Sequence, residues 1–377
     1  MPRPSTMTPN AAPVGTDFDR AMMQRCITLA KQAAGRTAPN PMVGAVVVKD
    51  GQIIGEGFHP GAGQPHAEVF ALREAGEAAR GATIYVSLEP CNHHGRTPPC
   101  SQAVVKAGVK KVVVGMVDPN PLVAGGGLQT LRDAGIEVLV GVEEAACREL
   151  NAGFIWRMLH KRPFGILKYA MTLDGKIATT TGHSAWITHQ ETRNQVYDLR
   201  SRCDAVIVGG NTVRLDNPYL TTHALTPHNP LRVVVSQSLD LPGDRHLWDV
   251  TIAPTVVITQ ATANPEMQDF LRQRGVEVVH IDPVSPDRVM QYLYDQGCLQ
   301  VLWECGGTLA AAAIASGSIQ KVMAFIAPKI IGGQGAPTPV GNLGLTLMDQ
   351  AIALENVQLQ SIGHDFLLTG DLPNLEK

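Results

Sequence analysis

The chain has 377 residues, of which 44% are hydrophobic, and its net charge is −3. This length allows two domains with separate cores, and the charge provides no broad basic field, which disfavours a nucleic-acid substrate. Seven cysteines in so long a chain do not form a disulfide framework and fit a reducing cytosol. Because no apolar run reaches about 18 residues, no membrane span is expected, and we predict a cytoplasmic protein.

The first half of the chain predicts a short leader followed by an α/β pattern. Residues 1–16 are rich in Pro, Thr and Ala and lack an apolar stretch, which predicts a disordered leader and not a signal peptide. Asp17 is expected to cap a helix that reaches about Ala34, and a single long helix is expected over residues 143–159. Further strands are expected at residues 43–48, 52–58, 83–88, 111–116 and 137–140, and further helices at 66–74 and 100–107.

The order of these elements, strand–strand–helix–strand–helix–strand, predicts an α/β layer sandwich over residues 17–160. A second α/β pattern begins at Phe164, so a second domain is expected over residues 163–377. Its strands are expected at residues 165–171, 205–208, 231–235, 255–258, 276–281, 300–303 and 321–327, and its helices at 189–202, 265–274, 286–296 and 308–315.

One imidazole, two thiols and a carboxylate stand near the ends of predicted elements in the first domain. His66, Cys91 and Cys100 are ligand types that zinc favours, and three protein ligands leave a fourth tetrahedral position for water, as in catalytic sites. Glu68, two residues from His66, is placed to carry protons between that water and a substrate nitrogen. The pattern is typical of zinc-dependent nucleobase deaminases.

The spacing of the two cysteines differs from the usual short form of that signature. Eight residues separate Cys91 from Cys100, where two are usual, although two Pro and one Gly among them allow the loop to fold back. Two other interpretations remain open at this point. One is a pair of unrelated buried cysteines, and the other is a closed structural zinc site with His93 or His94 as the fourth ligand.

Five segments of the first domain resemble the bifunctional riboflavin-biosynthesis deaminase/reductase family: PNPMVG (39–44), HAEV (66–69), LEPC (88–91), HHGRTPPC (93–100) and DPNPLV (118–123). The long cysteine spacing is that family's own pattern. The resemblance implies a cytidine-deaminase-like α/β/α sandwich and the substrate 2,5-diamino-6-ribosylamino-4(3H)-pyrimidinone 5′-phosphate, which loses its 2-amino group as ammonia. We expect Asn40 to bind the pyrimidine edge and His93 and Arg96 to bind the ribose phosphate, the alternatives being a turn residue and a solvated loop.

The second domain has no G-x-G-x-x-G after a strand, so a standard Rossmann site is not indicated. A strand ending at Glu304, followed by Gly306 and Gly307 at the start of a helix, is nevertheless an arrangement that can hold a phosphate. Five segments resemble the reductase half of the same family: KYAMTLDGK (168–176), SAWIT (184–188), GGNTVRLDNP (209–218), ECGGTL (304–309) and PKIIGG (328–333). The resemblance implies a dihydrofolate-reductase-like fold that uses NADPH to reduce the ribosyl group to a ribityl chain.

The family's reductase residues, carried onto the matching positions of this chain, form two groups. Where the family usually has a phosphate-binding arginine this chain has His223, so either His223 binds the phosphate in a pH-dependent way or Arg200 or Arg214 compensates. The cofactor-facing residues are expected to be Ala170, Trp186, Thr212, Asp216, Ser236, Gly306, Gly307, Thr308, Leu309, Ala310, Ala311 and Ala312. The substrate-facing residues are expected to be Lys168, Ser184, Arg200, Leu220, His223 and Glu304.

The leading hypothesis is an enzyme with two activities, zinc-dependent deamination followed by NADPH-dependent reduction, which yields 5-amino-6-ribitylamino-uracil 5′-phosphate. A deaminase with an inactive second domain and a non-catalytic, zinc-stabilised scaffold are the competing interpretations. The expected partner is a small-molecule ribotide, not nucleic acid or a membrane. The resemblance further implies a homo-oligomer, a dimer or tetramer formed through the reductase domain.

Overall fold

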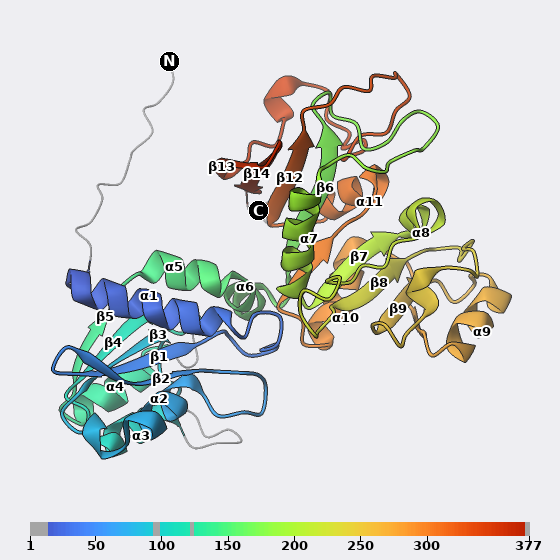
Figure 1. Ribbon diagram of the computed structural model, residues 1–377. Helices are drawn as coiled ribbons and strands as arrows, with labels where there is room; N and C mark the ends of the chain where they lie inside the picture. Colours follow the sequence, from blue (N-terminus) through green and yellow to red (C-terminus); the bar gives the residue numbers. More distant parts are fainter. Residues whose placement is uncertain (1–13, 93–98, 121–123, 374–377) are drawn as a thin grey trace. The chain divides into compact units, whose positions relative to one another are not determined.

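The computed structural model describes residues 14–92, 99–120 and 124–373 (Figure 1). Two compact units divide the chain: residues 1–33 and 40–155 form the first, and residues 34–39 and 156–377 form the second. The predicted leader falls largely on residues 1–13, which lie outside the described residues. Among the residues that are described, no helix is both long and apolar enough to cross a membrane.

The first unit is built on a five-stranded sheet with the order β2-β1-β3-β4-β5. β1 pairs with β2 and β3 in an antiparallel manner, and β4 and β5 extend the sheet in parallel. β1, β3 and β4 are buried almost throughout, because helices cover both faces of the sheet. The strands are β1 (Gly44–Lys49), β2 (Gln52–Phe58), β3 (Thr83–Leu88), β4 (Lys111–Met116) and β5 (Glu137–Val140).

Helices form the two outer layers of the first unit. α1 and α5 pack on one face of the sheet, whereas α2 packs on the other, with α3 beside it (Figure 1). This confirms the predicted layer sandwich, although α4 was not predicted. The helices are α1 (Asp17–Lys31), α2 (Ala67–Ala75), the short 3₁₀ helix η1 (Gly76–Ala79), α3 (Cys100–Ala107), α4 (Gly126–Asp133) and α5 (Glu144–Leu150).

The start of α1 differs from the prediction by one residue. Thr16, not Asp17, is the N-cap: its Oγ1 accepts a hydrogen bond from the Asp19 N–H at 3.1 Å, and the Asp19 carboxylate accepts one from the Thr16 N–H at 2.9 Å. This reciprocal capping box satisfies two backbone donors, which a cap at Asp17 would leave unpaired. The helix ends at Lys31 and not at Ala34.

The prediction of a single helix over residues 143–159 is wrong. This segment forms two helices, α5 and α6 (Ala152–His160), which are separated at Asn151. The Asn151 side chain bonds the backbone of Met42, donating to its C=O and accepting from its N–H, both at 2.9 Å. Because asparagine competes well for backbone groups, this distant contact breaks an otherwise regular helical pattern.

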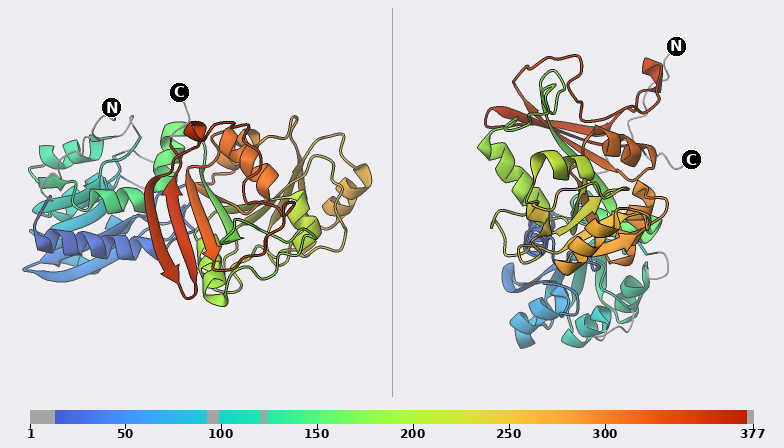
Figure 2. Two further views of the ribbon diagram at one scale, coloured as in Figure 1. Left: turned by 90° about the horizontal axis from the view of Figure 1, so that it is seen from above. Right: turned by 90° about the vertical axis from the view of Figure 1, so that its right-hand side faces the viewer.

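The second unit contains a nine-stranded sheet with the order β10-β9-β8-β7-β11-β6-β12-β14-β13. The run from β10 to β12 is parallel, and β14 and β13 (red in Figure 2) add an antiparallel edge that was not predicted. The strands are β6 (Phe164–Thr172), β7 (Ala205–Gly209), β8 (Leu231–Val235), β9 (Thr255–Thr259), β10 (Glu277–His280), β11 (Gln300–Trp303), β12 (Lys321–Ala327), β13 (Glu355–Ile362) and β14 (Asp365–Asp371).

Alternate residues of the parallel strands face two helical layers. Ile207 of β7 packs with side chains of α10 and α11, whereas Val206 and Val208 pack with those of α7, α8 and α9. The four predicted helices are present, but α8, which begins with Gly210, was missed. The helices are α7 (Gln190–Ser201), α8 (Gly210–Asp216), η2 (His246–Trp248), α9 (Pro265–Gln273), α10 (Pro286–Asp295), α11 (Gly307–Ala315) and η3 (Met348–Gln350).

Candidate active sites

The three predicted metal ligands converge in the first unit. His66 Nδ1 lies 3.1 Å from Cys100 Sγ and 3.6 Å from Cys91 Sγ, and the ligand atoms of all three residues lie within 4.8 Å of one another. Tetrahedral zinc with nitrogen and sulfur ligands at normal bond lengths separates such atoms by about 3.5–3.8 Å. The arrangement therefore fits one zinc ion and argues against two unrelated cysteines.

Each ligand stands at the end of an element. His66 is the N-cap residue of α2, Cys91 follows β3, and Cys100 is the first residue of α3. The Cys100 N–H donates to Cys91 Sγ at 3.3 Å. The pKa of Cys91 falls to about 4, first because of its hydrogen bond with the Cys100 thiol and also because of His66. At neutral pH Cys91 is therefore a thiolate, the form of cysteine that binds metals.

Glu68 lies in the first turn of α2, and only 3% of it is exposed. Burial is the main reason that its pKa rises to about 7. A carboxyl group that changes its protonation state near neutral pH suits proton transfer. Glu68 therefore remains the candidate general acid and base beside the three ligands.

Asn40 is oriented by His59, a residue that sequence patterns do not single out. His59 Nδ1 lies 3.1 Å from the Pro65 carbonyl, which can only accept, so this nitrogen carries the proton. His59 Nε2 must then accept from Asn40 Nδ2, which lies 3.1 Å away. Burial lowers the pKa of His59 and keeps the ring neutral. Among the described residues no group binds Asn40 Oδ1, which is left to accept a hydrogen bond.

Glu89 holds the loops around Cys91, and the sequence offers no signal for this beyond its place in the LEPC segment. Its buried carboxylate accepts four backbone hydrogen bonds at 2.9–3.3 Å. A Cβ on Gly127 would lie 2.0 Å from the Pro90 carbonyl oxygen, so only glycine allows this close approach. The four N–H donors to Glu89 are those of Asp118, Gly125, Gly127 and Leu128.

Part of the predicted deaminase site lies outside the described residues. His93, His94 and Arg96 belong to residues 93–98, so phosphate binding by His93 and Arg96 stays a prediction. The same holds for a fourth zinc ligand at His93 or His94. Within the part of the chain that the structure describes, His66, Cys91 and Cys100 form the single group of His, Cys, Asp and Glu side chains that could hold a metal.

The predicted reductase residues of the second unit gather at the C-terminal ends of parallel strands. β11 lies between β7 and β6, where the strand order reverses, and open α/β sheets bind ligands outside such a point. Glu304 directly follows β11, Ser236 directly follows β8, and Lys168 and Ala170 lie on β6. The topology thus brings together residues that are far apart in the sequence.

Glu304 is the centre of a buried charge cluster. Its carboxylate accepts hydrogen bonds from Arg200 Nε at 2.6 Å, from Arg200 Nη2 at 3.1 Å and from Lys168 Nζ at 3.3 Å. Burial alone would raise the pKa of Glu304, but the charges of Arg200 and Lys168 outweigh it and hold the pKa at about 2. With two cations and one anion, the cluster keeps a net positive charge.

Gly306 and Gly307 have different surroundings. A Cβ on Gly306, the N-cap residue of α11, would meet nothing within 4 Å, whereas a Cβ on Gly307 would lie 2.6 Å from the Thr338 carbonyl oxygen. The Gly341 N–H also donates to the Gly307 carbonyl at 2.9 Å. Gly306 therefore has open space for a ligand, and Gly307 permits the close packing of the segment around residues 338–341.

The other predicted cofactor residues lie around this edge with different degrees of exposure. Ser184 Oγ donates to Asp216 Oδ1 at 2.9 Å, so two predicted positions are joined. Trp186 and Thr308 are exposed, and Thr212 and Leu309 are half-buried. Ala310 and Ala311 of α11 are buried, and Ala310 belongs to the core, unlike the exposed Ala312.

His223 stands in an aromatic cluster near the Glu304 cluster. Its ring stacks on Tyr197, with 4.1 Å between the centroids, and Arg200 Nη1 donates to the carbonyl of Thr221 at 2.9 Å. Burial, and then the charge of Arg200, lowers the pKa of His223. Leu220 in the same loop is buried.

The alternative cations for the phosphate, Arg200 and Arg214, are both engaged. Arg200 binds Glu304, and Arg214 donates to Asn211 and to the Asp240 carbonyl. These bonds use three of the five N–H donors of Arg200 and two of those of Arg214, so each guanidinium keeps donors for a further contact. His223, Arg200 and Arg214 all remain candidates for the phosphate contact.

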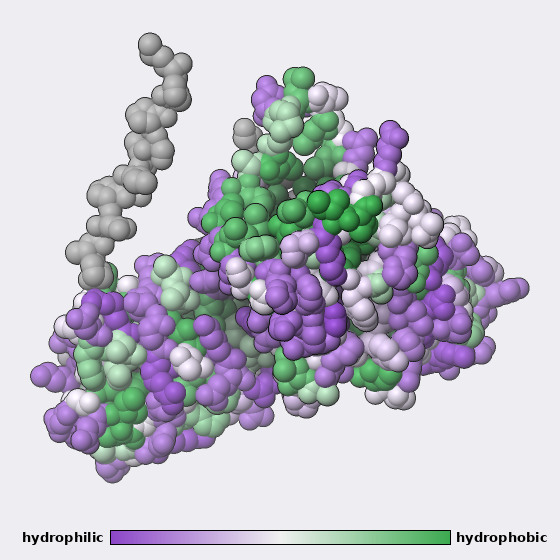
Figure 3. Space-filling view, turned by 45° about the horizontal axis from the view of Figure 1, so that its top comes forward, coloured by the Kyte–Doolittle hydropathy of each residue, from purple (hydrophilic) through white to green (hydrophobic). Residues whose placement is uncertain are grey.

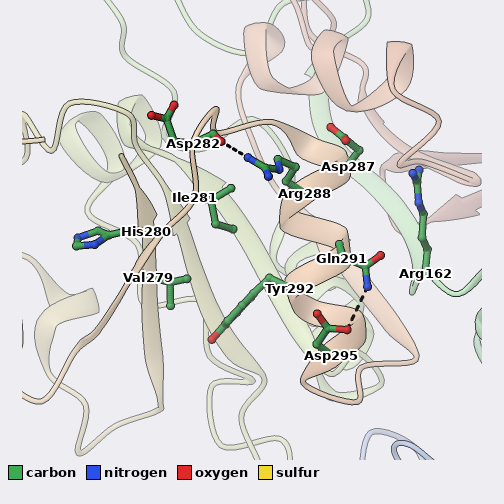
Figure 4. Close-up of a pocket in the computed structure, with 10 residues that line it drawn as sticks. All are labelled: Arg162, Val279, His280, Ile281, Asp282, Asp287, Arg288, Gln291, Tyr292 and Asp295. Atoms are coloured by element: carbon green, nitrogen blue, oxygen red, sulfur yellow. Dashed lines mark hydrogen bonds between the residues drawn. The ribbon is translucent and has the colours of Figure 1, made fainter. Parts of the chain in front are cut away.

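A hollow of about 570 Å³ lies elsewhere in the second unit, beside β10 and α10 (Figure 4). Its polar groups are largely satisfied locally: Arg288 donates to the Asp282 carbonyl, and Gln291 donates to Asp295 at 3.1 Å. It contains none of the predicted site residues.

Comparison with known proteins identifies a family for each half of the chain. The cytidine and deoxycytidylate deaminase zinc-binding region matches residues 16–116, and the RibD C-terminal domain matches residues 163–368. The riboflavin biosynthesis protein RibD of Synechocystis sp. is 60% identical over 94% of this chain and 96% of its own length. The chain belongs to the RibD family. Within the longer riboflavin biosynthesis protein PYRR, chloroplastic, of Arabidopsis thaliana, which is 46% identical, the chain covers 61% of the length.

Solved RibD-family structures have the same fold. RibD of Acinetobacter baumannii is 41% identical with a TM-score of 0.84, and the match covers 94% of this chain and 99% of that one. A Thermotoga maritima protein, described as a diaminohydroxyphosphoribosylaminopyrimidine deaminase/5-amino-6-(5-phosphoribosylamino)uracil reductase, is 37% identical with a TM-score of 0.82 over the same fractions. The predicted fold class, a cytidine-deaminase-like domain followed by a reductase domain, is confirmed.

The cofactors of the RibD family are zinc in the deaminase domain and NADPH in the reductase domain. The residues present fit the metal, since one imidazole and two thiols converge at distances that suit zinc. They also fit a nucleotide cofactor, since Gly306 opens α11 with free space at its Cβ position beside a positively charged cluster.

Proposed function

We infer that this chain catalyses two consecutive steps of riboflavin biosynthesis. The first is the hydrolytic deamination of 2,5-diamino-6-ribosylamino-4(3H)-pyrimidinone 5′-phosphate, and the second is the NADPH-dependent reduction of its ribosyl group to ribityl. The observation that carries this conclusion is the convergence of His66, Cys91 and Cys100 beside the buried Glu68 in a chain of the RibD family. The chain thus acts on small molecules.

In the deamination, a C–N bond of the pyrimidine is exchanged for a C–O bond from water, and ammonia leaves. Zinc, when bound by His66, Cys91 and Cys100, supplies a Lewis acid that acidifies water. We assign to Glu68 the transfer of a proton from the water to the departing nitrogen, which a carboxyl group with a pKa near 7 can perform. Asn40 would offer its Oδ1 to an N–H of the pyrimidine.

In the reduction, the hydride chemistry belongs to NADPH, and the protein binds and aligns the two reactants. The net positive cluster around Glu304 suits a phosphorylated substrate. Lys168 is bound by one acceptor among the described residues, so its remaining donors are available to the substrate, whereas Arg200 is committed to Glu304 and Thr221. We therefore assign Lys168 to substrate contact and Arg200 to holding Glu304 and the loop of Thr221.

The test is NADPH oxidation by purified protein supplied with the diaminopyrimidinone ribotide. Wild type should release ammonia and oxidise NADPH, whereas Glu68→Ala should do neither. Supplying the deaminated ribotide should restore NADPH oxidation in Glu68→Ala, and the exposed Glu77→Gln should behave as wild type. If wild type released ammonia without oxidising NADPH, the chain would have deaminase activity and no reductase activity. If wild type released no ammonia, the substrate assignment would be contradicted.

The assembly and location are also proposals. β13 is the edge strand of the second unit's sheet, and its Val357 and Leu359 side chains are 54% and 66% exposed, which favours a homo-oligomer through this unit. Figure 3 shows hydrophobic residues gathered on one face of this unit. The seven cysteines are all free thiols, which supports a reducing compartment such as the cytoplasm. Sedimentation of wild type and Leu359→Glu would test the assembly.

A further inference from the structure

Trp186 presents an aromatic ring to solvent in the second unit. It is 70% exposed, whereas Trp248 and Trp303 are 3% and 0% exposed. The Arg193 guanidinium lies over one face of the Trp186 ring, with its Cζ 4.5 Å from the ring centroid. A cation over one face leaves the opposite face as the stacking surface.

Arg193 is itself held in place. Its Nη1 donates to the Thr188 carbonyl at 2.8 Å, and its Nη2 donates to Gln190 Oε1. These bonds tie the guanidinium to the first turn of α7 and to the segment that carries Trp186. The orientation of the Trp186 ring therefore depends on a fixed cation and not on a mobile side chain.

Lys329 fixes the main chain of the same segment. Its Nζ donates to the carbonyls of Trp186 at 3.0 Å and of Ile187 at 2.7 Å. The Lys329 segment is anchored to the end of β6, because the Leu173 N–H donates to the Lys329 carbonyl at 2.8 Å. The Asp174 carboxylate also accepts the Gly332 N–H at 2.7 Å.

We propose that Arg193 and Lys329 are positioning residues that hold Trp186 as a stacking platform for a flat ring of NADPH. The inference rests on the proposed function, because it requires an NADPH-dependent reductase in which Trp186 faces the cofactor, as the family resemblance implies. Neither side chain contacts the cofactor in this scheme. Each instead keeps the Trp186 segment ordered before the cofactor binds. Less conformational entropy is then lost on binding.

The test measures NADP⁺ binding by calorimetry and the quenching of tryptophan fluorescence by acrylamide. In wild type, NADP⁺ should protect the exposed Trp186 from acrylamide, and Trp186→Phe should remove that protection. Lys329→Met and Arg193→Met should each weaken NADP⁺ binding by about two- to tenfold, the range for the loss of an ordinary net hydrogen bond or of a cation–π contact at an exposed position. The KM for NADPH should rise with kcat kept, and Lys329→Arg should restore binding.

The matched control is Arg274→Met, since Arg274 also lies over an aromatic ring, that of Phe270 at 3.9 Å, but on α9 and its C-terminal cap. It should bind NADP⁺ as wild type does. Unchanged binding in both Lys329→Met and Arg193→Met would overturn the proposal while leaving the proposed function intact. Failure of wild type to bind NADP⁺ would overturn both.

Discussion

Arg200 holds Glu304 through both oxygens of its carboxylate, with Nε 2.6 Å from Oε1 and Nη2 3.1 Å from Oε2. The same guanidinium donates to the Thr221 carbonyl at 2.9 Å. One buried cation thus joins the end of β11, helix α7 and the loop that carries His223. Removing one partner of a buried ion pair leaves the other charge uncompensated, so the cluster is expected to stabilise the second unit. We also propose that it forms part of the reductase site.

Glu304→Ala should destabilise the second unit by about 3–5 kcal/mol, because Arg200 and Lys168 would face each other without their shared anion. The pKa of Glu304 lies below its ordinary value, so its contribution is full above pH 4.5 and is lost as the pH falls from about 4.5 to about 2. Chemical denaturation at several pH values should show this loss in wild type. If Glu304→Ala lost stability in acid to the same extent as wild type, the pH dependence assigned to Glu304 would be contradicted. Glu266→Gln on α9 is the control and should behave as wild type.

Gly127→Ala should lower the zinc content of the purified protein. The new Cβ would lie 2.0 Å from the Pro90 carbonyl oxygen, so the segment leading to Cys91 would have to move. Gly126→Ala is a matched control, since its Cβ would have no neighbour closer than 3.6 Å. Metal analysis and thermal unfolding of both variants check this expectation. Equal zinc content in the two would show that the close approach is not needed.

Gly306→Ala should weaken NADPH binding, whereas Gly307→Ala should lower the stability of the second unit. At Gly307 the methyl group would meet the Thr338 carbonyl oxygen at 2.6 Å, so the unfolding temperature should fall. At Gly306 the methyl group has free space, so stability should be kept while the KM for NADPH rises, because a phosphate could no longer approach the backbone. Unchanged NADPH binding in Gly306→Ala would contradict the proposal that a phosphate of the cofactor lies against the backbone at this position.

His223→Arg should lower the KM for the reductase substrate. Burial and Arg200 hold the pKa of His223 below its ordinary value, so the neutral ring predominates at neutral pH and gains charge only as the pH falls. The wild-type KM should accordingly fall as the pH is lowered below about 6.5, the ordinary pKa of histidine, and this trend should be absent in His223→Arg. A KM for the variant at or above that of wild type would argue against a phosphate contact.

Removal of zinc with a chelator should separate the two activities. Ammonia release should be lost, because His66, Cys91 and Cys100 would no longer hold the Lewis acid. NADPH oxidation with the deaminated ribotide should remain, since no residue of this group belongs to the second unit. Loss of both activities would indicate that the metal also supports the reductase unit.

The convergence of His66, Cys91 and Cys100 could be predicted, because each residue type and its place beside the end of a helix or strand can be read directly from the sequence. His59 and Glu89 could not, because a histidine after a strand and an acidic residue before Pro90 are common in loops. Their importance comes from the groups that they meet, such as Asn40 and four backbone N–H groups. The helix break at Asn151 was missed for the same reason, since its partner Met42 lies 109 residues away.

The amino-acid sequence by itself determined the α/β pattern of both halves and predicted the three candidate zinc ligands and the candidate proton carrier Glu68, because periodicity, capping and ligand chemistry act within a few residues. Only the tertiary structure decided that Arg200, 104 residues before Glu304, would bind it, and that β13 and β14 would extend the sheet. Such contacts depend on strand order and on the packing of whole layers, which no local pattern encodes.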